Sequence, residues 1–265
     1  MAEQVQIAPV TVASDLTMED LRAALSAGWQ DFRAYPAFGL FFSAIYIAGG
    51  FLLYLALFHW GELTWLAPAA AGFPLLAPFA AVGLYEVSRR REQGLPMKWG
   101  AILGALRGRG DEQILMMGVT VFVFFSFWLG LAHGIFAIFM ADSSMTGVAE
   151  NSLALFHTGP GLMMVIFGGF VGAIIALILY SITVMSLPLL VDRDADFITA
   201  IIVSLGTVRS NTAVMLVWAL IIAILVFIAM LPAFLGLLVV LPLLGHATWH
   251  LYRRAVSPSA APVPA

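Results

Sequence analysis

The sequence predicts an all-α, polytopic transmembrane helical bundle of about six spans, arranged as three hairpins that are each preceded by an interfacial amphipathic helix. Three observations predict this class. Hydrophobic residues make up 62% of the 265-residue chain, uncharged apolar runs of about 20 residues recur along it, and the basic residues are confined to alternate loops. Charged residues make up only 10% of the chain, which excludes an ordinary soluble domain.

The first unit follows a polar N-terminus, residues 1–14, which we expect to be disordered. Thr17 and Asp20 stand at capping distance, and a helix extending to Ala34 follows them. Its apolar residues recur at three- and four-residue spacing: Leu21, Leu25, Trp29 and Phe32. Residues 37–58 form the first predicted span, and residues 64–85, which contain three prolines, form a kinked second span.

The second unit begins with a predicted interfacial helix over residues 97–106, followed by a span over residues 113–140. Residues 158–191 are almost continuously apolar and too long for one untilted crossing, so we expect a bend at Pro188. The third unit contains an amphipathic stretch over 197–209 and two spans over 212–231 and 233–249. The Pro- and Ala-rich tail, residues 255–265, is expected to be disordered.

These units divide one membrane domain, residues 15–254, into a threefold repeat of residues 15–91, 92–193 and 194–254. Pro-Leu-Leu triplets beginning at Pro74, Pro188 and Pro242 support the repeat, one in each unit. A second alignment of these prolines competes with this one. Three such hairpins can pack around an axis along the membrane normal or as a plain bundle.

Charge predicts the orientation of the chain. All 12 Lys and Arg residues fall in the loops that would share one side with the two termini, so the termini are predicted to be cytoplasmic. Only three acidic residues, Glu62, Asp142 and Glu150, fall on the opposite side. The arginines expected to contact lipid headgroups or to anchor the cytoplasmic face are Arg33, Arg89, Arg90, Arg91, Arg209, Arg253 and Arg254.

Several chemical classes are excluded by residue content. The chain has no cysteine, so disulfides and thiolate metal sites cannot form within it. No basic patch interleaved with aromatic residues indicates a nucleic-acid partner. No nucleophile motif or phosphate-binding loop occurs, so we predict no catalytic residues and no enzymatic activity.

The histidines are weak metal candidates. His59, His133 and His157 are expected near the outer face and close to carboxylates, where they could hold a metal or relay protons. Their spacing matches no metal motif, so the favoured interpretation is that His133 bonds a neighbour and the other two lie in loops. His246 and His250, one turn apart, could bind a metal or act as interfacial groups. We therefore expect no cofactor, with haem or metal as the alternative.

Two further features concern packing. Gly168, Gly169 and Gly172 form a small-residue face that allows close helix approach, within the chain or with a partner subunit. Glu86 is expected to pair with an arginine of the cluster that follows it. The spans otherwise hold few polar groups, mainly Ser43, Ser126, Tyr180, Ser181 and Thr183.

Four stretches carry a family resemblance: Trp29-Gln30-Asp31-Phe32-Arg33 to Pro36, Gly39-Leu40-Phe41-Phe42, Leu75-Leu76-Ala77-Pro78 and Gly83-Leu84-Tyr85-Glu86. With these stretches the sequence resembles a prokaryotic integral membrane protein family of unknown function, and the similarity covers most of the predicted six-span region. Some members of that family are labelled as cytochrome c oxidase subunits. The resemblance implies a multi-pass protein of the bacterial inner membrane, in contact with lipids and other integral membrane subunits and without a redox centre of its own.

Two functions follow as hypotheses. The first is a non-catalytic accessory subunit or assembly factor of a larger inner-membrane complex, with a respiratory oxidase or supercomplex as the implied partner. The second is a small transporter or channel for an unknown solute, in which the proline-broken even-numbered spans would line a pathway.

Overall fold

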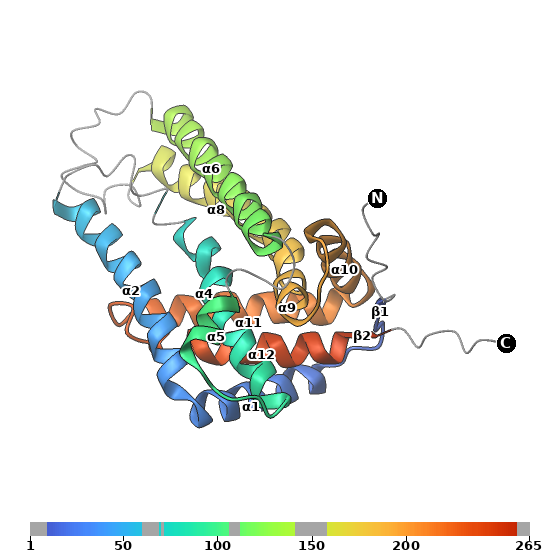
Figure 1. The fold of residues 1–265 in the computed structure, drawn as a ribbon. Coiled ribbons are helices and arrows are strands. Elements are labelled where there is room, and N and C mark those ends of the chain that lie inside the picture. The colour runs from blue at the N-terminus through green and yellow to red at the C-terminus, as the bar shows by residue number, and fades with distance from the viewer. Residues whose placement is uncertain (1–9, 60–68, 70–71, 106–111, 141–157, 259–265) are drawn as a thin grey trace, which may run out of the picture.

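A computed structural model of the protein describes residues 10–59, 69, 72–105, 112–140 and 158–258 (Figure 1). The described chain is almost wholly helical, as expected for an all-α membrane protein. Its elements in the first half are β1 (Val10–Val12), α1 (Met18–Ala34), α2 (Pro36–His59), the 3-10 helix η1 (Phe73–Leu76), α4 (Ala77–Glu92), α5 (Trp99–Gly104) and α6 (Gln113–Met140). Those in the second half are α8 (Gly159–Thr183), α9 (Ser186–Asp192), α10 (Phe197–Ser210), α11 (Thr212–Met230), α12 (Leu237–Ala255) and β2 (Val256–Pro258).

The centre of the fold is α12. It lies beside α1 in Figure 1 and also packs against α2, α4 and α11. Gly28 allows the approach of α1, because a Cβ there would lie 2.6 Å from the backbone nitrogen of Ala247. Trp249 and Tyr252 on α12 and Trp218 on α11 are fully buried in the core around this contact.

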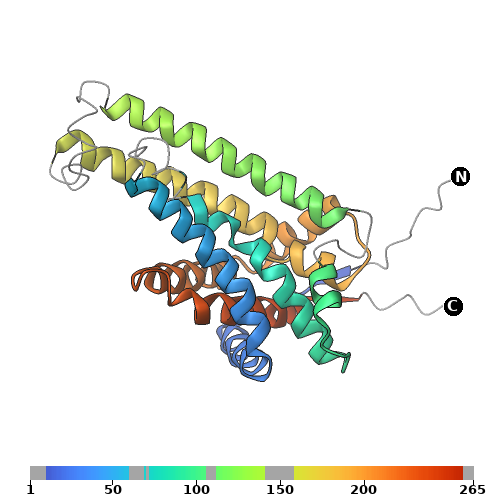
Figure 2. The ribbon, with the colours of Figure 1, turned by 60° about the vertical axis from the view of Figure 1, so that its left-hand side comes forward.

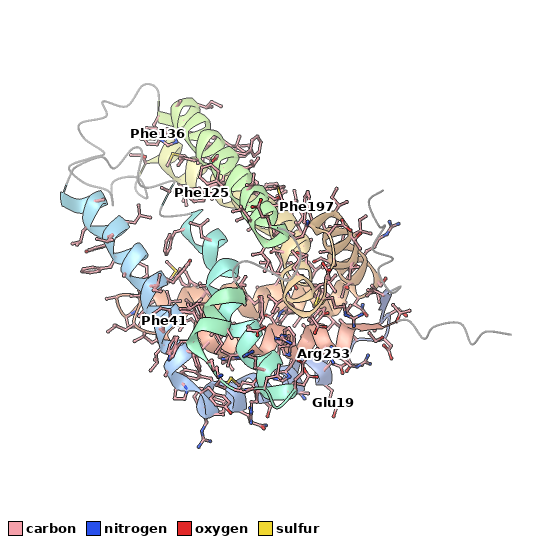
Figure 3. All side chains as sticks on the ribbon, viewed as in Figure 1. Glu19, Phe41, Phe125, Phe136, Phe197 and Arg253 are labelled. Carbon is pink, nitrogen blue, oxygen red and sulfur yellow. The ribbon has the colours of Figure 1, made fainter. Side chains whose placement is uncertain are left out.

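A second layer consists of α6 and α8. Figure 2 shows these two helices running side by side along one flank of the molecule. The pair is antiparallel, because Trp128 packs on Gly172 while Phe139 packs on Phe167. Only 22% of the most apolar 18-residue stretch of α6 is buried inside the protein. For the segment formed by α8 and α9, the corresponding share is 11%. Phe125 and Phe136 mark the length of α6 in Figure 3.

Four helical segments of the described chain are long and apolar enough to cross a membrane: Pro36–Ala56, Gln113–Met140, Gly159–Asp192 and Thr212–Met230. The other two predicted spans do not reach that standard. Part of the predicted span over residues 64–85 lies outside the described residues, and the rest is η1 and α4. The sixth is α12, which is shorter in its apolar part because Pro242, two histidines and two arginines lie on it.

The long apolar segment bends close to the predicted position. Helix α8 ends at Thr183, and α9 begins at Ser186 with Pro188 in its first turn. A proline within a helix clashes with the carbonyl four residues earlier, here that of Val184. The break therefore falls at residues 184–185, one turn before Pro188.

The amphipathic helices form at the predicted places. Thr17 and Asp20 make a complete capping box at the start of α1. However, α1 buries Leu21, Ala24, Gly28, Asp31 and Phe32, whereas the predicted stripe residue Trp29 is 42% exposed. The buried face of α1 thus packs on α12, and the expected packing of the whole apolar stripe on a membrane surface is not what the structure shows. The second predicted amphipathic helix is shortened to α5, and the third is α10.

The expectation of disordered ends fails for residues 10–14 and 255–258. Val10–Val12 pairs antiparallel with Val256–Pro258, so β1 and β2 form a two-stranded ribbon. The side-chain amide of Asn211 then donates to the Ala13 carbonyl at 2.7 Å, and its oxygen accepts from the backbone N–H of Leu16 at 3.0 Å. These bonds join the segment that follows β1 to the start of α11. Residues 1–9 and 259–265 lie outside the described chain.

Candidate functional site

Five polar side chains from three helices meet where α1, α4 and α12 converge. We call them the Asp31 cluster: Asp31 on α1, Ser88 and Arg91 on α4, and His246 and His250 on α12. The close approach at Gly28 brings α1 against α12, and Asp31 follows one turn later on the same face. Asp31 is 3% exposed, so its charge has been almost fully removed from water.

The hydrogen bonds of the cluster assign its protons. The Ser88 hydroxyl donates to Asp31 Oδ2 at 2.5 Å, and His250 Nε2 lies 2.8 Å from the same oxygen. Arg91 pairs with the other carboxylate oxygen of Asp31. Because Ser88 gives its only proton to the carboxylate, its oxygen accepts from Nδ1 of His246 at 2.7 Å. A chain of bonds thus runs from Asp31 through Ser88 to His246.

The carboxylate of Asp31 is ionised at neutral pH. Burial by itself raises the pKa of Asp31, but hydrogen bonds from His250 and Ser88 and the nearby histidines hold that pKa below its ordinary value. Arg91 neutralises the charge. The cluster is therefore a buried ion pair whose carboxylate also accepts hydrogen bonds from Ser88 and His250, which is the arrangement that makes such a pair tolerable.

The cluster contains serine, histidine and aspartate, but its geometry differs from that of an activated serine. In a nucleophilic triad the histidine accepts the serine proton and the aspartate orients the histidine. Here Ser88 lies between the other two and donates to Asp31 itself. Ser88 is also 1% exposed, so its oxygen does not face a substrate. The arrangement joins three helices.

Further ion pairs surround the cluster and define what we call the ion-pair end of the molecule. Arg89 forms two hydrogen bonds of 2.7 Å with Glu86, which confirms the predicted pairing of Glu86. Two more groups of charges hold the C-terminal part of α12 to the rest of the fold. Their members are Glu92, Asp192, Tyr252 and Arg253 in one group, and Asp15, Asp20 and Arg254 in the other. Arg253 marks this end in Figure 3.

Five of the seven predicted headgroup-binding arginines have carboxylate partners inside the protein: Arg89, Arg90, Arg91, Arg253 and Arg254. Each of these therefore has a negative partner within the fold. Arg33 and Arg209 are exposed and have no ion pair within the described part of the chain. Contact with lipid headgroups stays a prediction for all seven.

The three candidate metal histidines are not assembled into a site that the structure describes. His133 Nδ1 donates to the Leu129 carbonyl at 2.7 Å, one turn back on α6. His157 and the side chain of His59 lie outside the described residues. Among the described residues, no group of three or more histidines, cysteines and carboxylates could hold a metal ion. The alternative metal interpretation of His246 and His250 gives way to their bonds within the Asp31 cluster.

The predicted glycine face on α8 lies partly against α6. A Cβ at Gly172 would meet the Trp128 ring at 3.0 Å, and one at Gly168 would lie 3.8 Å from Ile135. A Cβ at Gly169 would meet nothing within 4 Å. Gly168 and Gly172 therefore lie where α6 approaches α8, whereas Gly169 faces away from the described protein.

A second small-residue face on α6 was missed by the sequence reasoning. Ser126, Gly130, Gly134 and Ala137 recur at helical spacing, and all four are exposed. A Cβ at Gly130 or Gly134 would meet nothing within 4 Å. The Gly-x-x-x-Gly spacing in the sequence could have identified this face. We call it the α6 groove.

A cavity of about 500 Å³ lies between α2, α4, α8, α11 and α12. Seven alanines help to line it, from α4 (Ala77, Ala80, Ala81), α8 (Ala173, Ala176) and α11 (Ala219, Ala223). Helices pack with axes about 8–10 Å apart, and alanine side chains on facing helices leave part of that space unfilled. The polar residues of the lining are Ser43, Tyr85, Tyr180, Thr183 and Thr248.

The fold and this site define an integral membrane protein of the all-α class. Residues 66–192 match the family model described as "Predicted integral membrane protein (DUF2189)", which supports the resemblance to an uncharacterised membrane protein family. No curated protein and no solved structure matches the chain. The matched segment includes Ser88 and Arg91, whereas Asp31, His246 and His250 lie outside it.

Proposed function

We propose that this protein is a non-catalytic accessory subunit or assembly factor of a larger complex in a bacterial inner membrane. The observation that carries the proposal is the α6 groove. Within a helix, glycine is about 1 kcal/mol less favourable than alanine. Close packing of α6 on α8 accounts for Gly172, because a Cβ there would lie 3.0 Å from the Trp128 ring, whereas a Cβ at Gly130 or Gly134 would meet nothing that the structure describes.

A transmembrane helix of another protein fits the α6 groove. Helices associate in lipid where small residues let their backbones approach, because lipid itself gives no hydrophobic drive for association. Large exposed apolar residues lie on both sides of the groove, Phe122 on one side and Phe127 and Ile138 on the other, and would contact such a helix. Some members of the family that the sequence resembles are labelled as cytochrome c oxidase subunits. A respiratory oxidase is therefore the first class of partner to test.

The test is co-purification from native membranes in mild detergent. We expect the wild-type protein to elute with other membrane subunits and the Gly130→Ile, Gly134→Ile double variant to elute without them. Gly169→Ile on α8 is the matched control, because it adds the same side chain at an open glycine off the groove. A wild-type protein that elutes only as a free monomer would rule out the proposal. Loss of partners in the control alone would rule out the groove.

Six crossings with cytoplasmic termini form the second part of the proposal. The support is that basic residues far apart in the chain, at 89–91, 193 and 253–254, form ion pairs at one end of the fold. With α4 and α12 returning to that end, the positive-inside rule is satisfied throughout. With a cytoplasmic N-terminus, crossing only by the four helices that are long and apolar enough would place Arg89, Arg90, Arg91, Arg193 and Arg209 on the outer side.

Single cysteines can decide between these topologies, because the chain contains none of its own. With six crossings, a membrane-impermeant maleimide added to intact cells labels Asp142→Cys and leaves Ser210→Cys unlabelled. With four crossings the two results are exchanged. Labelling of both variants after the membrane is permeabilised shows that each cysteine can react.

The transporter hypothesis receives less support from the geometry. A polar solute needs hydrogen-bonding or charged groups along its path. No charged side chain of the described residues lines the cavity, and Tyr180, Thr183 and Thr248 already bond backbone carbonyls. We therefore do not propose transport of a polar solute.

A further inference from the structure

We infer that the cavity between α2, α4, α8, α11 and α12 binds a membrane lipophile, an apolar chain or ring system that carries a carbonyl group. The volume of about 500 Å³ lies within the roughly 300–1,000 Å³ range of small-molecule sites. Its lining consists mainly of alanine, leucine and other aliphatic residues, with no charge among the described ones. Such walls favour an apolar body over a hydrated one.

The cavity opens toward lipid between α8 and α11. Both helices are among the four long enough to cross a membrane, and they do not pack closely along their length. Leu177 on α8 and Leu216 and Leu220 on α11 line the cavity and are also 40–58% exposed, so they form its mouth. At the end nearer the ion pairs, the Tyr180 hydroxyl donates to the Met215 carbonyl at 2.8 Å and joins the two helices. A molecule dissolved in the bilayer can therefore enter sideways.

Ser43 supplies the polar anchor for this ligand. Its side chain is fully buried on α2, lines the cavity, and its hydroxyl has no hydrogen-bond partner among the described residues. A serine in a membrane helix commonly bonds the carbonyl one turn back, as Thr183 and Thr248 do in this fold. Ser43 does not, so the proton of its buried hydroxyl has no acceptor among the described residues at this wall of the cavity.

The Tyr85 hydroxyl is a second donor in the lining, on α4. Tyr85 is 4% exposed, lines the cavity from α4, and makes no hydrogen bond to the described part of the chain. Each of these hydroxyl donors without an acceptor can bond a carbonyl oxygen. Ester lipids and isoprenoid quinones both carry that group on an apolar body, so the experiment has to separate these sources.

The probes are two diazirine reagents added to the full-length protein in lipid nanodiscs: a diacyl phospholipid labelled in one acyl chain and a short-chain benzoquinone labelled in its tail. After illumination, peptide mass spectrometry locates the attached probe. We expect attachment on the cavity walls of α4, α8 and α11. Attachment of the phospholipid alone identifies an ester lipid, and attachment of the quinone alone identifies a quinone. Attachment of both supports the shared chemistry.

Two substitutions test the location. Ala219→Phe fills the cavity from α11 and should reduce attachment by at least about tenfold, whereas Ala213→Phe, at an exposed position outside the lining of the same helix, should leave it unchanged. Ser43→Ala removes a single oxygen and should weaken binding by roughly fivefold. If Ala219→Phe does not fold, the result for Ser43→Ala still tests the inference. Equal attachment in Ala219→Phe and Ala213→Phe, or attachment only on outward faces, would overturn the inference.

Discussion

Removal of the Asp31 carboxylate is the strongest test of how this fold is held together. In Asp31→Ala, the buried Ser88 hydroxyl loses its acceptor, and Arg91 and His250 lose their negative partner. Breaking a buried ion pair by removing one member costs about 3–5 kcal/mol. The side chains of Arg91 and His250 are 36% and 26% exposed and can regain water, which reduces the loss. We expect about 3 kcal/mol.

The measurement is thermal unfolding in detergent, followed by the fluorescence of the tryptophans. A change of 3 kcal/mol corresponds to a Tm lower by roughly 6–12 °C for a chain of this size. Asp31→Asn keeps the side-chain volume and one acceptor oxygen. Its Tm should therefore lie between those of the wild type and Asp31→Ala. The control is Asp194→Ala, which removes an exposed aspartate that forms no ion pair within the described chain. If the Tm of Asp31→Ala falls no further than that of this control, the cluster does not hold the three helices together.

The effect of Asp31→Ala on stability should depend on pH. The folded-state pKa of Asp31 is lower than its unfolded value, so its contribution to stability is complete above the unfolded pKa of about 4. That contribution is lost as the pH falls through the folded-state pKa. The difference in Tm between the wild type and Asp31→Ala should therefore be constant near neutral pH and shrink below about pH 4. A constant difference down to pH 2 would contradict the assignment.

Three further substitutions test the packing of α12, each by the same unfolding assay. Gly28→Leu should destabilise by more than about 1–3 kcal/mol, because its Cβ meets the α12 backbone, while Gly104→Leu, in open space, should not. Tyr252→Phe removes a 2.8 Å bond to Asp192 and should cost roughly 1.5–3 kcal/mol. Arg254→Ala breaks exposed ion pairs and should cost under about 1 kcal/mol, decreasing with added salt.

Local features of the fold could be predicted from the sequence because their partners are near in the chain. The capping box of Thr17 and Asp20 spans three residues, and so does the pair of Glu86 and Arg89. The Asp31 cluster joins residues up to 219 positions apart, and no local pattern encodes that. One signal was present, however: Asp31 continues the apolar stripe of α1 at helical spacing from Leu21.

The cavity shows a second limit of sequence reasoning. Each alanine in its lining is an ordinary helix residue, and the empty space arises only because α4, α8 and α11 present alanines toward the same region. The number of crossings is difficult for a related reason. The apolar run over residues 233–249 predicts a span, but α12, which contains most of it, is not among the four helices apolar enough to cross a membrane. Its polar residues His246 and Tyr252 are fully buried against protein. Hydropathy treats each helix as if lipid surrounded it, and here the neighbouring helices supply the polar partners.

Helices α4 and α12 both contribute residues to the Asp31 cluster and to the lining of the cavity. The stability of the cluster is therefore linked to the geometry of the cavity. Leu84 and Tyr85 line the cavity one turn before Ser88, and Gly245 and Thr248 line it on either side of His246. The bond between Ser88 and His246 fixes α4 against α12 at this point. The α8–α11 side has one cross-link, from Tyr180, and loose packing beyond it. A ligand entering there would meet one wall held by buried charge and one that can move. Changes of shape on binding should therefore occur mainly in α8 and α11.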